Sequence, residues 1–211
     1  MIRKGQRCLW IFLLCIIGIS GVFAQEGQRF ALVIGNGDYQ HTTPLANPIN
    51  DAIDIAGSLE KFGFQVALET NTTTASMDQA IRQFVDFVSN NPTEIALFYY
   101  AGHGVQYEGV NYLLPVNVDI QNNYELMDKT ISMDRITNGL DQSGSPFNLI
   151  MLDACRDNPF SETRGSSRGL SIMGDGGQGS MVVFATAPGS VAQDGEGSNS
   201  PFAGALLEHI T

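Results

Sequence analysis

The chain has 211 residues, of which 43% are hydrophobic and 16% are charged. This size and composition predict one folded domain with a sizeable core and argue against a disordered protein. Aspartate and glutamate outnumber lysine and arginine by 22 to 11, which gives a formal net charge of −11. The balance argues against nucleic-acid binding and against adhesion to an anionic membrane, and it favours a cationic substrate or partner.

The first 24 residues have the features of a secretory signal peptide. Cations are concentrated in residues 3–7, an apolar run follows over residues 9–22, and small residues occupy Val22 and Ala24. We therefore expect cleavage before Gln25, export to the periplasm or the extracellular space, and a mature domain over residues 25–211. The alternative is an uncleaved N-terminal anchor, for which the apolar run is short.

From residue 29 onward, strand-like apolar runs alternate with amphipathic segments at helical spacing. In the first half we expect strands at 30–34, 64–68 and 94–100, and helices at 47–62 and 77–88. In the second half we expect hairpin strands around Gly109 within a polar stretch at 105–129, a helix at 134–141, strands at 147–152 and 180–186, a mobile loop at 157–179, and a helix from Pro201. That last helix runs to the final residue, Thr211, which indicates a domain truncated at its C-terminal end.

This alternation predicts an α/β domain whose sheet is mostly parallel and covered by helices on both faces. In such sheets, ligands bind beyond the carboxyl ends of the strands. Three of the expected loops lie there, at residues 101–104, 153–157 and 187–196. The residues with the most reactive side chains fall in these same loops.

Cys155 is the only cysteine beyond the signal peptide, so the mature chain cannot form an internal disulfide. It is either a buried, inert thiol or a residue used for its chemistry. His103 stands between Gly102 and Gly104, where small neighbours leave an imidazole accessible. The simpler alternative is a histidine that fits a tight turn. An imidazole at an adjacent strand end raises the thiolate fraction of a cysteine, so the two residues are candidate catalytic partners.

Several motifs, in order along the chain, resemble those of caspase-like cysteine peptidases of the metacaspase and bacterial caspase-homologue group. They are ALVIGN at 31–36, NDA at 50–52, YYAGHG at 99–104, YLLP at 112–115, LDACRDNPF at 152–160 and ATAPG at 185–189. His103 precedes Cys155 by 52 residues, close to the caspase separation of about fifty. The resemblance spans essentially the whole mature chain.

The resemblance implies a three-layer α/β/α sandwich of the caspase type and a cysteine endopeptidase with a Cys–His dyad. Cys155 would attack the scissile carbonyl, and His103 would act as general base and then as general acid. The backbone N–H groups of Gly104 and Cys155 would form the oxyanion hole.

The resemblance also implies an acidic pocket for the substrate residue before the scissile bond. Asp153 and Asp51 match pocket acids of metacaspase-like relatives, and Asp194 falls where paracaspases have a third acid. Carboxylates that converge on one pocket favour arginine or lysine, so we expect protein or peptide substrates with basic residues. Simpler alternatives are a carboxylate that interacts with a helix dipole for Asp51 and a solvated loop residue for Asp194.

We expect no metal cofactor. Many metacaspases bind calcium through an Asp-Asp pair, but the matching place here reads Met133-Asp134, which makes a calcium site doubtful despite nearby Asp119 and Glu162. Two other functions stay open. One is a catalytically silent caspase-fold module that binds a partner protein or a basic peptide, and the other is a cysteine-dependent transferase or transpeptidase that uses the same dyad.

Overall fold

The computed structural model describes residues 27–91, 93–155, 179–185 and 197–210, and of Cys155 it describes the backbone only. The expected signal peptide and the expected loop at 157–179 lie outside these residues, apart from Gly179. The elements in chain order are β1 (Gln28–Gly35), α1 (Pro48–Lys61), β2 (Phe64–Thr70), α2 (Thr74–Asn90), β3 (Thr93–Tyr107), β4 (Val110–Leu113), α3 (Tyr124–Lys129), β5 (Ile131–Ser132), α4 (Met133–Gln142), β6 (Asn148–Cys155), β7 (Ser180–Phe184) and α5 (Pro201–His209).

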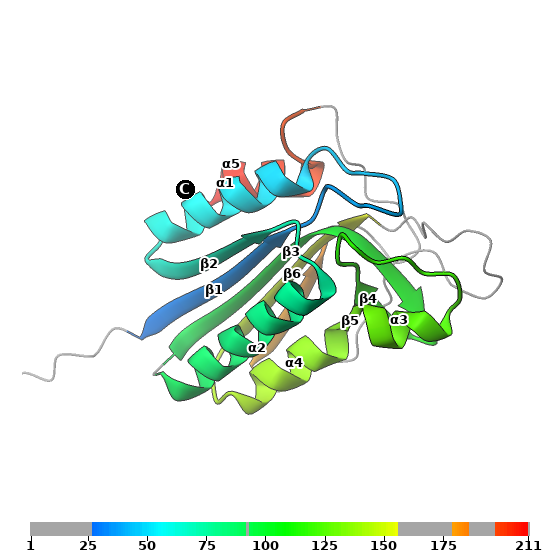
Figure 1. Cartoon of the computed structure of the whole chain (residues 1–211). Coiled ribbons are helices and arrows are strands. Elements are labelled where there is room, and N and C mark those ends of the chain that lie inside the picture. Colours follow the sequence, from blue (N-terminus) through cyan, green and yellow to red (C-terminus); the bar gives the residue numbers. More distant parts are fainter. Residues whose placement is uncertain (1–26, 92, 156–178, 186–196, 211) are drawn as a thin grey trace, which may run out of the picture.

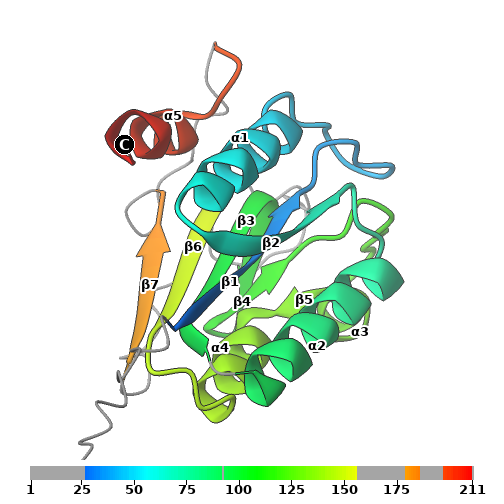
Figure 2. The same cartoon turned by 90° about the vertical axis from the view of Figure 1, so that its left-hand side faces the viewer.

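Five strands form a parallel sheet in the order β2-β1-β3-β6-β7, and β4 and β5 extend it in antiparallel fashion from the far end of β3. Helices α1 and α5 cover one face, and α2 and α4 cover the other (Figures 1 and 2). The predicted three-layer α/β/α fold with a mostly parallel sheet is confirmed. Among the described residues, none of the helices combines the length and the apolar character needed to cross a bilayer.

Side-chain alternation along the strands builds a separate core on each face of the sheet. In β1, Phe30, Leu32 and Ile34 pack with α2 and α4. The intervening Ala31 and Val33 pack with α1 and α5. Because successive side chains of a strand point to opposite faces, the continuous apolar run is what a strand buried on both faces requires.

The structure corrects the expected end of the third strand. β3 continues through 101–104 to Tyr107, so His103 lies in a strand and not in a loop. The strand continues because it turns back into β4 at Glu108 and Gly109, whose φ values of 49° and 83° suit a two-residue hairpin turn. The predicted hairpin around Gly109 is confirmed.

Two further differences concern the helices. The short helix α3 was not expected, because six residues carry too little periodic signal to separate it from the polar stretch around it. The expected helix from Pro201 ends at His209 and does not run to Thr211; the Ile210 N–H donates to Leu206 O and closes its last turn.

Candidate active site

The sheet register places His103 of β3 beside Cys155, the last residue of the neighbouring strand β6. They are the last partners in the parallel register between β3 and β6, after Ala101 with Asp153 and Gly102 with Ala154. Neighbouring strands are about 4.8 Å apart in the hydrogen-bonding direction. His103 is only 3% exposed, so its imidazole is held in place and not free in solvent.

A backbone carbonyl determines which imidazole nitrogen carries the proton. Nε2 of His103 lies 2.8 Å from Thr43 O. A carbonyl oxygen can only accept a hydrogen bond, so Nε2 is the protonated nitrogen in the neutral ring. Nδ1 is then the nitrogen with a lone pair, which is the arrangement that a general base needs.

Gly104 follows His103 directly in β3 and pairs with Leu113 of β4. It therefore lies at the same end of the sheet as the backbone of Cys155. The Leu114 N–H donates to His103 O at 3.1 Å, which ties the hairpin to this corner. The oxyanion-hole role expected for Gly104 and Cys155 stays a prediction.

Two of the three predicted pocket acids converge. Asp51 lies in the first turn of α1 and Asp153 near the end of β6, and both are buried. Asp51 Oδ1 accepts a hydrogen bond from the Ser200 N–H at 3.0 Å. Asp153 Oδ2 accepts one from the Ser200 hydroxyl and another from the Tyr99 hydroxyl at 3.2 Å. We call Asp51 and Asp153 the acid pair. Asp194 lies outside the described residues.

Burial and the acid pair both raise the pKa of Tyr99, the tyrosine beside the two carboxylates. Burial is the main cause that raises the pKa of Tyr99 well above its ordinary 10.0, and the charges of Asp153 and then Asp51 raise it further. The Tyr99 hydroxyl therefore keeps its proton and remains a donor to Asp153.

A family model described as the caspase domain matches residues 28–211. The chain belongs to this family. It is 27% identical over 137 residues to mucosa-associated lymphoid tissue lymphoma translocation protein 1 of Homo sapiens, a match that covers 64% of this chain and 16% of that protein. It is 28% identical over 145 residues to the homologue in Mus musculus, covering 66% of this chain and 17% of that protein. The matches span less than a fifth of either relative.

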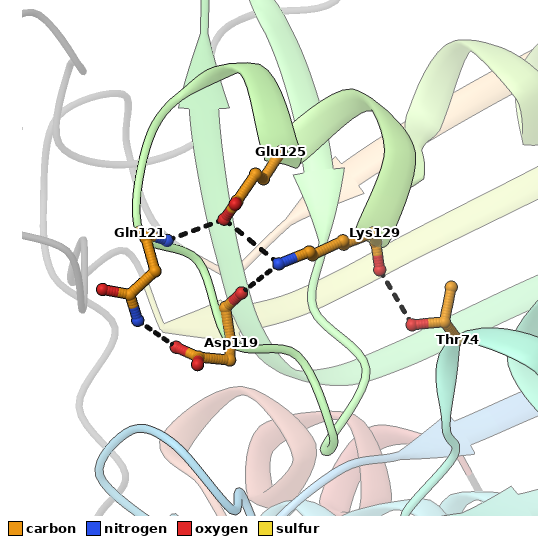
Figure 3. Close-up of polar contacts among 5 residues, drawn as sticks. All are labelled: Thr74, Asp119, Gln121, Glu125 and Lys129. Carbon is orange, nitrogen blue, oxygen red and sulfur yellow. Dashed lines mark hydrogen bonds and ion pairs between the residues drawn. The ribbon is translucent and has the colours of Figure 1, made fainter.

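Met133 stands at the position where the resemblance implies the first acid of a calcium-binding pair. Met133 is fully buried at the start of α4, in the core beneath α2. The nearby Asp119 is engaged by Gln121, as Figure 3 shows, and Lys129 donates to its backbone carbonyl at 2.7 Å while pairing with Glu125 at 3.2 Å. Within the described part of the chain, histidine, cysteine and acidic residues form no group of three suited to hold a metal ion. Glu162 lies outside it.

Ser200 is one of the residues at this site that the sequence analysis missed. It is the N-cap of α5 and its hydroxyl accepts a hydrogen bond from the Ala203 N–H at 2.9 Å. A serine before a Pro-initiated helix is a recognisable capping signal. The capping pattern gives no sign of the acid pair, because Asp51 and Asp153 come from distant parts of the sequence.

Proposed function

We propose that this caspase domain is a cysteine endopeptidase with Cys155 as nucleophile and His103 as general base and acid. The observation that carries the proposal is the register that pairs His103 of β3 with Cys155 at the end of β6. The bond from Nε2 to Thr43 O supports it, because it leaves Nδ1 as the proton acceptor. A noncatalytic module would have no need for an imidazole held in this tautomer beside the family's cysteine.

The reaction begins when the Cys155 thiol transfers its proton to Nδ1 of His103 and the thiolate attacks the scissile carbonyl. A C–S bond forms, and the backbone N–H groups of Gly104 and Cys155 stabilise the oxyanion. Collapse breaks the peptide C–N bond, and the amine leaves with the proton from His103. Water then attacks the thioester and gives a proton to His103; the C–S bond breaks, the acid product leaves, and His103 returns the proton to the sulfur of Cys155.

We propose that the residue before the scissile bond is arginine or lysine. The support is the acid pair, whose two buried carboxylates converge on Ser200 from α1 and β6. A guanidinium that reached them would meet two acceptors with little competing water, and its fork of donors suits bidentate contact with carboxylates. An acidic substrate residue would be repelled by the same charges.

Two further properties belong to the proposal. The activity needs no calcium, since the matching methionine, Met133, is buried in the core. The chain is exported by its first 24 residues, on the strength of the cationic and apolar pattern there. The N-terminal sequence of the protein recovered outside the cytoplasm tests the second property: it should begin at Gln25, and an intact Met1 start would contradict cleavage.

The decisive test of function compares peptides that differ only in the residue before the cut. The purified chain should hydrolyse the arginine and lysine peptides and leave the aspartate and leucine peptides intact, and Cys155→Ala should hydrolyse none. A preference for aspartate would overturn the role of the acid pair. Binding of the arginine peptide without hydrolysis would support the silent module, and product formed with an added amine nucleophile would reveal a transpeptidase.

A further inference from the structure

Tyr39 contacts the imidazole of His103 from the loop that follows β1. The tyrosine is 5% exposed, and its ring centroid lies 4.4 Å from that of His103 with the ring planes tilted by 49°. Aromatic rings at this separation attract each other beyond simple burial of area. The tyrosine ring therefore restricts the plane that the imidazole can adopt.

The hydroxyl of the same tyrosine holds the backbone of the same histidine. The His103 N–H donates to Tyr39 Oη at 2.7 Å, and Tyr39 Oη lies 3.2 Å from Tyr100 Oη. The Tyr100 hydroxyl in turn donates to His103 O at 2.8 Å. The two hydroxyls thus bind the N–H and the C=O of His103, while the ring of Tyr39 lies against its side chain.

Gly102 makes this approach possible. Its φ is +152°, and a Cβ there would lie 2.6 Å from Tyr39 Oη and 2.7 Å from Tyr100 Oη. A side chain would therefore push both hydroxyls away from the backbone of His103. Glycine before the histidine therefore suits both the positive φ and the close approach of the two tyrosine hydroxyls.

The loop that carries Tyr39 is itself fixed on both sides. The Gln40 N–H donates to Val116 O at 2.8 Å. Asn71 Oδ1 accepts from the N–H groups of Gly37 and Asp38, each at 3.0 Å. The same loop supplies Thr43 O, the acceptor for Nε2 of His103. One anchored segment therefore contacts the imidazole at its face and at one nitrogen.

We propose that Tyr39 is a positioning residue for His103. Its hydroxyl fixes the histidine backbone, and its ring holds the imidazole plane so that Nε2 stays on Thr43 O and Nδ1 serves the Cys155 thiol. Tyr39 acts through His103 and not on the substrate. The inference rests on the proposed peptidase function for its rate effects, but the contacts with the histidine stand apart from the choice of substrate.

Three variants separate the parts of this role. Tyr39→Phe keeps the ring and removes the hydroxyl, and Tyr39→Leu removes both. The matched control is Tyr112→Phe, which alters a buried tyrosine of the same apolar cluster on β4. With an arginine peptide, kcat should fall about tenfold in Tyr39→Phe and about a hundredfold in Tyr39→Leu, because small displacements of a catalytic group carry such costs. KM should change by less than about twofold, because the position of His103 affects the transition state and not the binding of the substrate.

A second readout does not depend on peptide hydrolysis. The rate at which iodoacetamide alkylates Cys155 is followed against pH by mass spectrometry of the peptide that contains it, in the full chain. In both Tyr39 variants the midpoint should move up toward that of a free thiol, about 8.5, because a misplaced imidazole stabilises the thiolate less. Tyr112→Phe should match the wild type in both measurements.

The outcomes distinguish this inference from the proposed function. If no peptide is hydrolysed but the alkylation profile shifts only in the Tyr39 variants, the positioning role stands and the peptidase proposal fails. If peptides are hydrolysed and the Tyr39 variants match Tyr112→Phe in kcat and alkylation, the positioning role is overturned. Should Tyr39→Leu fail to fold by circular dichroism, the comparison of Tyr39→Phe with Tyr112→Phe decides.

Discussion

Asp51 and Asp153 come from different elements, α1 and β6, and yet both carboxylates accept hydrogen bonds from one residue, Ser200. Ser200 contributes its backbone N–H to the first and its hydroxyl to the second, and it also caps α5. Ser200 therefore links the first turn of α5 to the acid pair. A change at Ser200 should consequently affect both stability and the recognition of basic residues.

Ser200→Ala removes the hydroxyl that caps α5 and donates to Asp153. We expect a loss of about 1 kcal/mol in the free energy of unfolding, as for other N-caps. We also expect kcat/KM for an arginine peptide to fall about tenfold, since hydrogen bonds to charged groups contribute more than neutral ones. The control is Thr73→Ala, which removes the N-cap of α2. It should cost similar stability without changing kcat/KM, and an equal loss of activity in both variants would contradict the coupling.

Asp153→Asn replaces a buried carboxylate with a neutral side chain of similar shape. Against arginine, kcat/KM should fall by about thirtyfold or more, because a buried charge partner is lost. The same peptide with citrulline is nearly isosteric but uncharged, so its slow hydrolysis should hardly change. Asp86→Asn on the exposed face of α2 serves as the charge-matched control. Equal effects on the arginine and citrulline peptides would show that Asp153 has no role in charge recognition.

Tyr99→Phe tests the raised pKa of the buried tyrosine beside the acid pair. Burial, Asp153 and Asp51 raise the pKa of Tyr99 well above 10.0 in the folded state. Above about pH 10 the unfolded chain loses this proton while the folded chain keeps it, so the free energy of unfolding falls, by at most about 1.4 kcal/mol per pH unit. Urea unfolding between about pH 9 and about pH 11 should show a shallower decline in Tyr99→Phe than in the wild type. Parallel declines would contradict the raised pKa.

The order of the longer strands and helices was predictable because each of them carries a clear apolar pattern. β1 shows this in its continuous run, and α2 in the spacing of Met77, Ile81, Phe84 and Val88, which are all buried. The continuation of β3 through His103 was not predictable. It depends on pairing with β4, a contact outside the local sequence.

In the candidate site, too, some residues were predictable from the sequence and others were not. The motifs around His103 and Cys155 identified the dyad candidates, because each motif is a short run of neighbouring residues that can be recognised in the sequence. Ser200, Thr43 O and Tyr39 act through contacts with residues far along the chain, and composition or spacing carries no trace of such contacts. The acid pair was expected from family resemblance, while its shared partner came only from the folded structure.

Calcium should have no effect on activity. Met133, at the position where the resemblance to metacaspases implies an acid, is buried in the core, and Lys129 pairs with Glu125 beside Asp119 (Figure 3). Hydrolysis of an arginine peptide should proceed at the same rate with added calcium and with a chelator. A rate that rises with calcium and saturates would contradict this expectation and would place a binding site elsewhere in the chain.

The most direct test of the dyad is labelling of Cys155 by an arginyl peptide that carries an electrophilic ketone, followed by mass spectrometry of the peptide containing that residue. We predict that the wild type is labelled and that His103→Ala is labelled at least about a hundredfold more slowly, because the thiol has lost its general base. Labelling of Cys155 at the same rate in both proteins would contradict the account.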